Sequence, residues 1–297
     1  MRRSVADVIA ERVVVLDGGL ATLLEAQGHD LSSTLWSARL LVDDPDAIRS
    51  AHRDFFRAGA EVAISASYQV GFENFEALGH SSAEVEDLLR TSVRLAAEAR
   101  DEVSPGGWVA ASVGPYGAVL ADGSEYRGDY DLDVAGLRAF HRPRLEVLGS
   151  AGADVLACET IPCLAEVEAL LAEISGSGHP AWLSVSSVGG KTRAGEPLDQ
   201  AFKMAAQVPE VIAVGVNCTA PPDVLAALTA LHGMAPGIVY PNSGQGWDAD
   251  RRCWTGEPAF DTADVASWIA AGARLVGGCC RVGIAEISAL AGSLQAS

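Results

Sequence analysis

The sequence predicts an α/β protein that folds as a single-domain (β/α)8 barrel, the TIM barrel architecture, over residues 1–297. Eight short runs rich in Val, Ile and Ala alternate with amphipathic segments along the chain. Such repeated strand–helix alternation is typical of a barrel of parallel strands, and a doubly wound sheet is the alternative. The 49% hydrophobic content is that of a packed globular protein, and no linker or change of composition divides the chain.

The predicted strands are short apolar runs, most of them followed by polar residues or glycine. In chain order they are Val13–Leu16, Val62–Ala66, Trp108–Val113, Val155–Cys158, Trp182–Val185, Ile212–Val216, Ile238–Tyr240 and Leu275–Val276. The segments between them carry apolar residues three and four positions apart, which predicts helices with one buried face. These helices include Ala47–Arg57, Ala83–Arg100, Val134–Leu148, Leu164–Ile174, Asp223–Leu231 and Thr262–Ala270.

Three of these helices are expected to end at a glycine just before the next strand. Gly59, Gly152 and Gly272 each follow a helical segment and precede an apolar run. Glycine adopts the left-handed conformation that often ends a helix without steric cost. No G-x-G-x-x-G motif follows the first predicted strand, which weakens the dinucleotide-binding version of the doubly wound alternative.

The chain is acidic, with 39 Asp and Glu against 21 Lys and Arg and a formal net charge of −18. Because phosphate backbones are bound by cationic surfaces, this balance argues against a nucleic-acid partner and mildly favours cationic small molecules. No apolar run approaches the ~20 residues that cross a bilayer. Asp7 and Glu11 interrupt the apolar segment that an export signal needs. We therefore expect a helical lead-in and a cytoplasmic protein without a membrane partner, whose oligomeric state stays open.

The chemistry of a (β/α)8 barrel lies at the carboxyl ends of its strands. There the sequence places carboxylates, amides, glycines and thiols, which we expect to converge on one rim. These positions are Asp17-Gly18-Gly19, Ser67-Tyr68, Gly114-Pro115-Tyr116, Glu159-Thr160, Ser186-Ser187, Asn217-Cys218, Asn242-Ser243 and Gly277-Gly278-Cys279-Cys280. An Asp-Gly-Gly alone is more often a turn, and a lone Glu at a helix start is more often a terminal charge. Their convergence therefore carries the prediction.

Three of the six cysteines form a candidate metal site. Cys279 and Cys280 follow two glycines, which free the backbone to leave strand geometry and turn both sulfurs toward one point. Cys218 ends the sixth predicted strand at the same level. Three thiolates with one open position describe a catalytic zinc site. The alternative is that these cysteines are buried packing residues.

Other residue types argue against other mechanisms. None of the six histidines follows a predicted strand, so neither a Ser-His-Asp triad nor a histidine-rich metal set is expected. Lys191 and Lys203 do not end strands, which argues against a Schiff-base aldolase.

Four strand-end motifs are specific when they are taken together. They are Asp17-Gly18-Gly19, Glu159-Thr160, Gly215-Val216-Asn217-Cys218 and Gly277-Gly278-Cys279-Cys280-Arg281. This combination resembles the homocysteine S-methyltransferase family, which includes betaine–homocysteine methyltransferase and the homocysteine module of cobalamin-dependent methionine synthase. Further stretches are similar to the smaller branch that uses S-methylmethionine or S-adenosylmethionine, so the resemblance runs along nearly the whole chain. They are Leu35–Ala38, Ala66–Gln69, Ser112–Gly117, Leu120–Tyr130 and Tyr240–Gly244.

The resemblance implies zinc as the cofactor, with Cys218, Cys279 and Cys280 as its ligands and as the catalytic residues. The implied substrate-binding residues are Asp17, Gly18, Gly19, Ser37, Glu159 and Asn217, and the implied donor-side residues are Trp36 and Tyr68. Glu159 would take the ammonium group of homocysteine, and the backbone N–H groups near Gly18-Gly19 suit its carboxylate.

The sequence departs from the family pattern at two places, one that concerns the methyl donor and one in a loop. Thr160 stands where the betaine-using branch has a tyrosine, which argues against betaine as the donor. The loop at residues 189–196 differs from the pattern of the branch, and its role stays open. The chain ends soon after the last predicted helix, so no cobalamin or folate module is expected.

The expected activity is zinc-dependent transfer of a methyl group from a sulfonium donor, S-methylmethionine or S-adenosylmethionine, to the thiol of homocysteine, which gives methionine. The expected partners are therefore small molecules. Selenohomocysteine, selenocysteine or another thiol stays open as the acceptor. A metal-dependent barrel hydrolase is a competing hypothesis, and so is a zinc-storage or thiol-sensing barrel. The hydrolase normally uses histidines and carboxylates, and the sensor would not explain Glu159 or Asp17.

Overall fold

The computed structural model describes residues 2–31, 35–248 and 253–295, and its central feature is a closed barrel of eight parallel strands. The strands are β1 (Val14–Val15), β2 (Val62–Ile64), β3 (Trp108–Val113), β4 (Val155–Ile161), β5 (Ala181–Val185), β8 (Val211–Asn217), β9 (Gly237–Tyr240) and β12 (Ala273–Val276). Strand β12 pairs in parallel with β1, and a parallel bridge between Leu16 and Val62 joins β1 to β2. The predicted (β/α)8 barrel is confirmed, and the doubly wound alternative is wrong.

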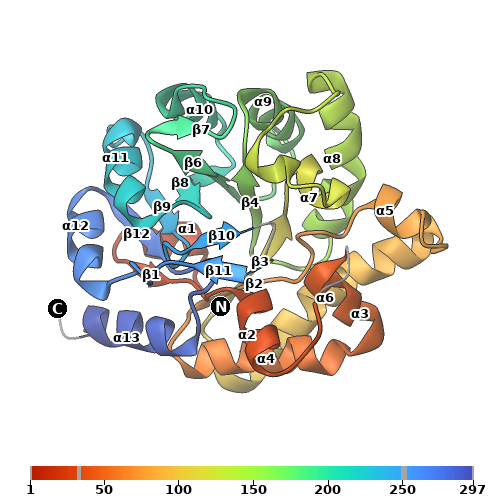
Figure 1. Cartoon of the computed structure of the whole chain (residues 1–297), viewed down its shortest axis with the longest axis horizontal. Coiled ribbons are helices and arrows are strands. Elements are labelled where there is room, and N and C mark those ends of the chain that lie inside the picture. The colour runs from red at the N-terminus through yellow and green to blue at the C-terminus, as the bar shows by residue number, and fades with distance from the viewer. Residues whose placement is uncertain (1, 32–34, 249–252, 296–297) are drawn as a thin grey trace.

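Helices surround the barrel on its outer side (Figure 1). The helices that precede the next strand, with α13 after the last strand, are α4 (Pro45–Arg57), α6 (Ser82–Val103), α8 (Val134–Gly149), α9 (Leu164–Ile174), α10 (Leu198–Ala205), α11 (Pro221–Leu231), α12 (Val265–Ala270) and α13 (Ile284–Gln295). The other elements are α1 (Val5–Ile9), α2 (Leu20–Ala26), η1 (Trp36–Arg39), α3 (Leu40–Asp43), α5 (Phe72–Glu76), α7 (Tyr116–Leu120), η2 (Ser124–Tyr126), η3 (Thr262–Asp264), the hairpin of β6 (Ser187–Val188) with β7 (Lys191–Thr192), and the hairpin of β10 (Gly246–Asp248) with β11 (Cys253–Thr255). Within the described ranges, no helix has both the length and the apolar character that crossing a membrane would require.

Local sequence signals set where the helices begin and end. At the start of α6, the Ser81 hydroxyl accepts the N–H of Glu84 at 3.4 Å, and the Glu84 carboxylate accepts the N–H of Ser81 at 2.7 Å. This reciprocal capping box satisfies two backbone donors that the first turn leaves free. The three predicted helix-ending glycines have left-handed φ angles, which are 105° at Gly59, 88° at Gly152 and 105° at Gly272. That prediction is confirmed.

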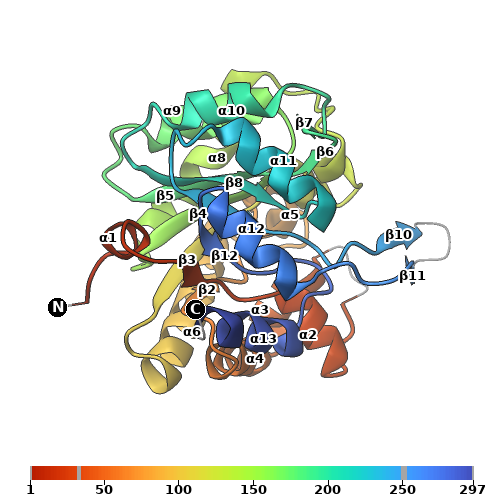
Figure 2. The same ribbon diagram turned by 90° about the vertical axis from the view of Figure 1, so that its left-hand side faces the viewer.

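Two apolar layers hold the fold together. Inside the barrel, side chains such as Leu16 and Trp182 pack against one another and against Val8 and Ile9 of α1. Outside it, residues such as Phe55 of α4 join the strands to the helices. The predicted helical lead-in is thus α1, which closes the amino end of the barrel. Figure 2 shows α1 at one end and the β10–β11 hairpin projecting at the other, where the strands have their carboxyl ends.

Candidate active site and metal centre

Three cysteine sulfurs from two strand ends lie together at the carboxyl end of the barrel. Cys218 directly follows β8, and Cys279 and Cys280 follow β12. The Sγ atom of Cys280 is 3.9 Å from that of Cys218 and 4.0 Å from that of Cys279, while Cys218 and Cys279 are joined as a disulfide. Burial raises the pKa of the Cys280 thiol to about 11. The structure thus brings the three predicted cysteines to one point, with two of them paired.

Glycines allow two chain segments to approach closely enough to build this cluster. A Cβ atom on Gly277 would lie 2.8 Å from the carbonyl oxygen of Asp17, and one on Gly278 would overlap a valine side chain. Opposite them, a Cβ atom on Gly19 would lie 2.6 Å from the carbonyl oxygen of Cys279. None of these glycines has a left-handed φ. The chain leaves the strand at these glycines, as predicted, and close packing against the neighbouring segment is the further reason that positions 277 and 278 have no side chain.

Two buried carboxylates, Asp17 and Glu159, lie near the thiols and interact with each other. One Asp17 oxygen accepts the N–H of Ile64 at 2.8 Å, and the other has no hydrogen-bond partner among the described residues. Glu159 accepts a hydrogen bond from the hydroxyl group of Ser112, and the Tyr240 phenol lies close to it. Burial raises the pKa of Glu159 to about 7, and burial together with the charge of Glu159 raises the pKa of Asp17 well above its usual range. The pair therefore favours a bound cation that also donates hydrogen bonds.

Glu159 and Thr160 lie inside β4, at an irregularity in its pairing with β5, and the prediction that they follow the strand is wrong. Thr160 has a φ of 61°, which a β-branched residue rarely adopts. Asn217 holds it there, because its Oδ1 accepts the N–H of Thr160 at 2.7 Å and its Nδ2 donates to the Thr160 hydroxyl at 2.7 Å. Asn217 thus fixes the bulge that presents Glu159. Its direct contact with substrate stays a prediction.

The predicted donor-side residues, Trp36 and Tyr68, are both half-buried. The phenol of Tyr68 lies beside the Thr160 hydroxyl, and burial raises the pKa of Tyr68 well above its usual range. Tyr68 is therefore a neutral phenol beside the Glu159–Thr160 bulge. Trp36 begins η1 with a φ of 47° and packs partly against the outer apolar layer. Ser37 follows it and is also half-buried, and the roles of Trp36 and Ser37 toward substrate stay predictions.

Two residues at the thiol cluster were not found from the sequence. Arg193, just after β7, donates from Nη2 to the carbonyl oxygen of Cys218 at 3.0 Å and from Nε to the hydroxyl of Ser186 at 2.9 Å. Its guanidinium carbon lies 5.4 Å from the centre of the Tyr126 ring. The Tyr126 phenol in turn lies beside the Cys280 thiol. Two sequence signals pointed toward them: the loop at residues 189–196 departs from the family pattern, and Tyr126 lies in the stretch Leu120–Tyr130 that is similar to the branch.

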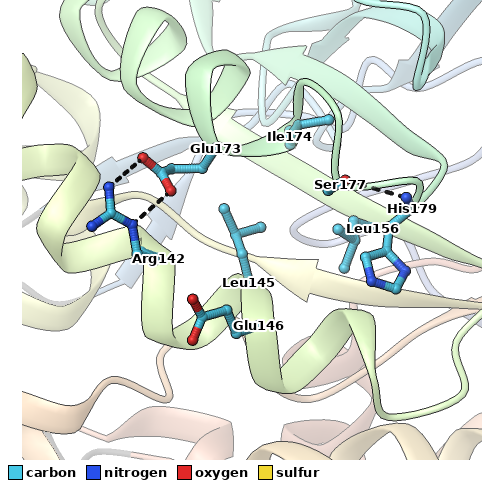
Figure 3. A pocket seen from close by; sticks show the side chains of 8 residues that line it. All are labelled: Arg142, Leu145, Glu146, Leu156, Glu173, Ile174, Ser177 and His179. Carbon is cyan, nitrogen blue, oxygen red and sulfur yellow. Dashed lines mark hydrogen bonds and ion pairs between the residues drawn. The ribbon is translucent and has the colours of Figure 1, made fainter.

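A cavity of about 270 Å³ lies elsewhere, between α8 and α9 (Figure 3). Arg142 and Glu173 form an ion pair at 2.9 Å on one side of it, and the N–H of His179 donates to Ser177 on the other. Its lining includes Leu156, which lies near the amino end of β4. Because the chemistry of this fold lies at the carboxyl ends of the strands, and because Arg142 and Glu173 pair with each other, this cavity is not a candidate active site.

The chain is similar along nearly its whole length to proteins that are already known. The profile that describes the homocysteine S-methyltransferase family matches residues 14–294. The chain is 47% identical over 291 residues, 94% of each chain, to the homocysteine S-methyltransferase of Escherichia coli strain K12. The metallated form of the E. coli homocysteine methyltransferase MmuM superposes with a TM-score of 0.87 at 43% identity, covering 97% of this chain and 99% of that one. Its oxidised form superposes with a TM-score of 0.85 at 45% identity, covering 95% and 96%. The chain therefore belongs to the homocysteine S-methyltransferase family.

Proposed function

We propose that this enzyme transfers a methyl group from a sulfonium donor to the thiol of homocysteine, with zinc held by Cys218, Cys279 and Cys280, and that S-methylmethionine is its preferred donor. One observation carries the proposal: three sulfurs converge beside the buried pair of Asp17 and Glu159. Homocysteine has a thiol for a sulfur-ligated metal and an ammonium group for a carboxylate pair. A reducing compartment such as the cytoplasm would keep the three thiols reduced, and we infer that the enzyme works there.

The donor set suits zinc. The ligand atoms of the three cysteines lie within 4.8 Å of one another, and soft thiolates select zinc over magnesium or calcium. A disulfide between Cys218 and Cys279 removes two of these ligands, so the reduced protein is the form expected to bind the metal. When it is bound, zinc keeps the sulfur of homocysteine as a thiolate at neutral pH, where a free thiol with a pKa of about 8.5 is mostly protonated.

The amino-acid part of homocysteine would be held by the segments around the two carboxylates. Its ammonium group would donate to Glu159 and to the Asp17 oxygen that has no partner among the described residues. Its carboxylate would meet the N–H of Gly18, because the N–H of Gly19 already donates to the carbonyl oxygen of Val282 at 2.9 Å. This orientation directs the thiol toward the cysteine cluster, which is the geometry that methyl transfer requires.

A sulfonium donor loses its positive charge during transfer, so its site needs apolar and aromatic surfaces more than fixed anions, which would stabilise the ground state. Tyr68, as a neutral phenol, and Trp36 supply such surfaces without a competing nucleophile. Thr160 occupies the place of the tyrosine found in the betaine-using branch, and its hydroxyl is engaged with Asn217 and Tyr68. Betaine is therefore the least favoured donor. S-methylmethionine ranks above S-adenosylmethionine because no Gly-rich loop offers an adenosine pocket.

The test compares initial rates of methionine formation for reduced, zinc-loaded enzyme with homocysteine and each of the three donors at equal concentration. We expect S-methylmethionine to be fastest, S-adenosylmethionine to be slower and betaine to be slowest. A betaine rate above both sulfonium rates would refute the sulfonium assignment, and a higher rate with S-adenosylmethionine would reverse the order of the two sulfonium donors. Selenohomocysteine as the acceptor in the same assay measures how strongly the site selects sulfur.

A further inference from the structure

Arg193 contacts the backbone of Cys218 and the ring of Tyr126, which lies beside Cys280. It does so although it follows neither of the two strands after which these cysteines lie. It follows the β6–β7 hairpin, and its guanidinium is half-buried at the rim of the barrel. Nη2 donates to the carbonyl oxygen of Cys218 at 3.0 Å, and Nε donates to Ser186 at 2.9 Å. The Ser186 hydroxyl donates to the same Cys218 carbonyl at 3.3 Å. The planar fork of the guanidinium therefore bonds this carbonyl both directly and through a neighbouring side chain.

The backbone at Cys218 is one that needs such support. Its φ is 45°, in the left-handed region that residues other than glycine adopt only when their surroundings hold them there. Its N–H donates to the carbonyl oxygen of Tyr240 at 3.3 Å, which is a long hydrogen bond. The hydrogen bond that the Cys218 carbonyl oxygen accepts from Arg193, at 3.0 Å, is thus shorter than the one that the Cys218 N–H donates.

The second link runs through Tyr126. The guanidinium carbon of Arg193 lies 5.4 Å from the centre of the Tyr126 ring, within the range of a cation–π contact. The Tyr126 phenol lies beside the thiol of Cys280. Arg193 therefore connects the turn of Cys218 to the aromatic residue beside Cys280, and it does so from a third segment of the chain.

We propose that Arg193 is a positioning residue that, together with Tyr126, holds the sulfurs of Cys218 and Cys280 in the arrangement that binds the metal. This inference rests on the proposed zinc site. Groups that orient metal ligands typically contribute 10- to 100-fold to metal affinity or activity. Lysine keeps the charge of arginine but lacks its planar fork, so it does not bond Ser186 and the Cys218 carbonyl at once.

The experiment measures zinc affinity of the reduced, full-length protein without substrates, by competition with a chromophoric chelator. Arg193→Met is expected to lower the affinity by about 10- to 100-fold, and Arg193→Lys by nearly as much. Tyr126→Phe keeps the ring under the guanidinium and should lose less. Lys191→Gln removes one positive charge from the same hairpin at an exposed position and is the matched control, expected to equal the parent.

A second readout separates positioning from general stability. With cobalt(II) at saturation in place of zinc, the thiolate–cobalt absorption of Arg193→Lys should differ from that of the parent, because the Cys218 turn is no longer fixed. Zinc affinity and cobalt spectra equal to those of the parent in Arg193→Lys would overturn the inference, even where Arg193→Met fails to fold. So would a defect confined to the KM for either substrate at saturating zinc. A parent protein that binds no zinc would instead contradict the proposed function itself.

Discussion

Replacing Glu159 by glutamine keeps the shape of a buried side chain and removes its charge, which should stabilise the protein while it damages catalysis. Burial raises the pKa of Glu159 from 4.5 to about 7 in the folded protein. A raised pKa favours the folded state at low pH, and this contribution is lost as the pH rises from about 4.5 through about 7. At about 1.4 kcal/mol for each pH unit, ionised Glu159 lowers the free energy of unfolding by about 3 kcal/mol at pH 8.

The difference in unfolding free energy between Glu159→Gln and the parent should therefore grow in favour of the variant by about 3 kcal/mol between pH 4.5 and pH 8. Urea denaturation of the reduced, substrate-free proteins at several pH values measures it. The structure supports so large an effect because Glu159 is only 7% exposed, so solvent does little to screen its charge.

The catalytic effect should have the opposite sign. A charge-assisted hydrogen bond to the ammonium group of homocysteine contributes about 1.5–3 kcal/mol, so kcat/KM for homocysteine should fall by about 10- to 150-fold. Zinc content should stay equal to that of the parent. The control substrate is 4-sulfanylbutanoate, which lacks the amino group, and its already low rate should change little in the variant.

Two results would refute this reasoning. If the stability difference between Glu159→Gln and the parent does not change with pH, Glu159 does not carry the buried charge that the structure assigns to it. If kcat/KM falls by the same factor for homocysteine and for 4-sulfanylbutanoate, Glu159 does not recognise the ammonium group.

Three further perturbations address the metal ligands, the β4 bulge and a buried histidine. Cys279→Ser should lose nearly all zinc and activity in metal analysis and rate assays, because a hydroxyl stays protonated. The control variant Cys163→Ala lies outside the cluster and should keep both. Full zinc in Cys279→Ser would contradict the assignment of this cysteine as a ligand. Asn217→Ala leaves the buried N–H of Thr160 unpaired, so the free energy of unfolding measured with urea should fall by about 1–3 kcal/mol and the KM for homocysteine should rise. Values equal to those of the parent would show that Asn217 does not stabilise the bulge. Burial lowers the pKa of His52 from 6.5 to about 4, so its contribution to stability is kept above about pH 6.5 and is lost as the pH falls toward 4. His52→Leu should therefore flatten the fall in unfolding free energy over that range, and an unchanged pH profile would argue against the buried neutral imidazole.

The barrel could be predicted from the sequence because its signals are local. The conformation of apolar runs such as Trp108–Val113 and of helix-ending glycines such as Gly152 depends on a few neighbouring residues. The carboxyl ends of parallel strands then share one rim by topology. This alone was sufficient to expect Cys218 and Cys279 near each other, although 61 residues separate them along the chain.

The contacts that shape the site could not be predicted in the same way, because they join segments that are distant in sequence. The bulge at Thr160 depends on an amide from β8, which the local sequence of β4 does not show. Gly277 and Gly278 are explained by a neighbouring segment rather than by their own φ angles. Arg193 reaches Cys218 only through the path of the β6–β7 hairpin, whose sequence gave no sign of a partner.

The most direct test of the account is a zinc titration of the reduced, metal-free parent enzyme, followed by its rate of methionine formation from homocysteine and S-methylmethionine. The account predicts that the rate rises in proportion to bound zinc and reaches its maximum at one zinc per chain. Full activity in the metal-free enzyme, or one zinc bound per chain with no methionine formed from any sulfonium donor, would contradict it.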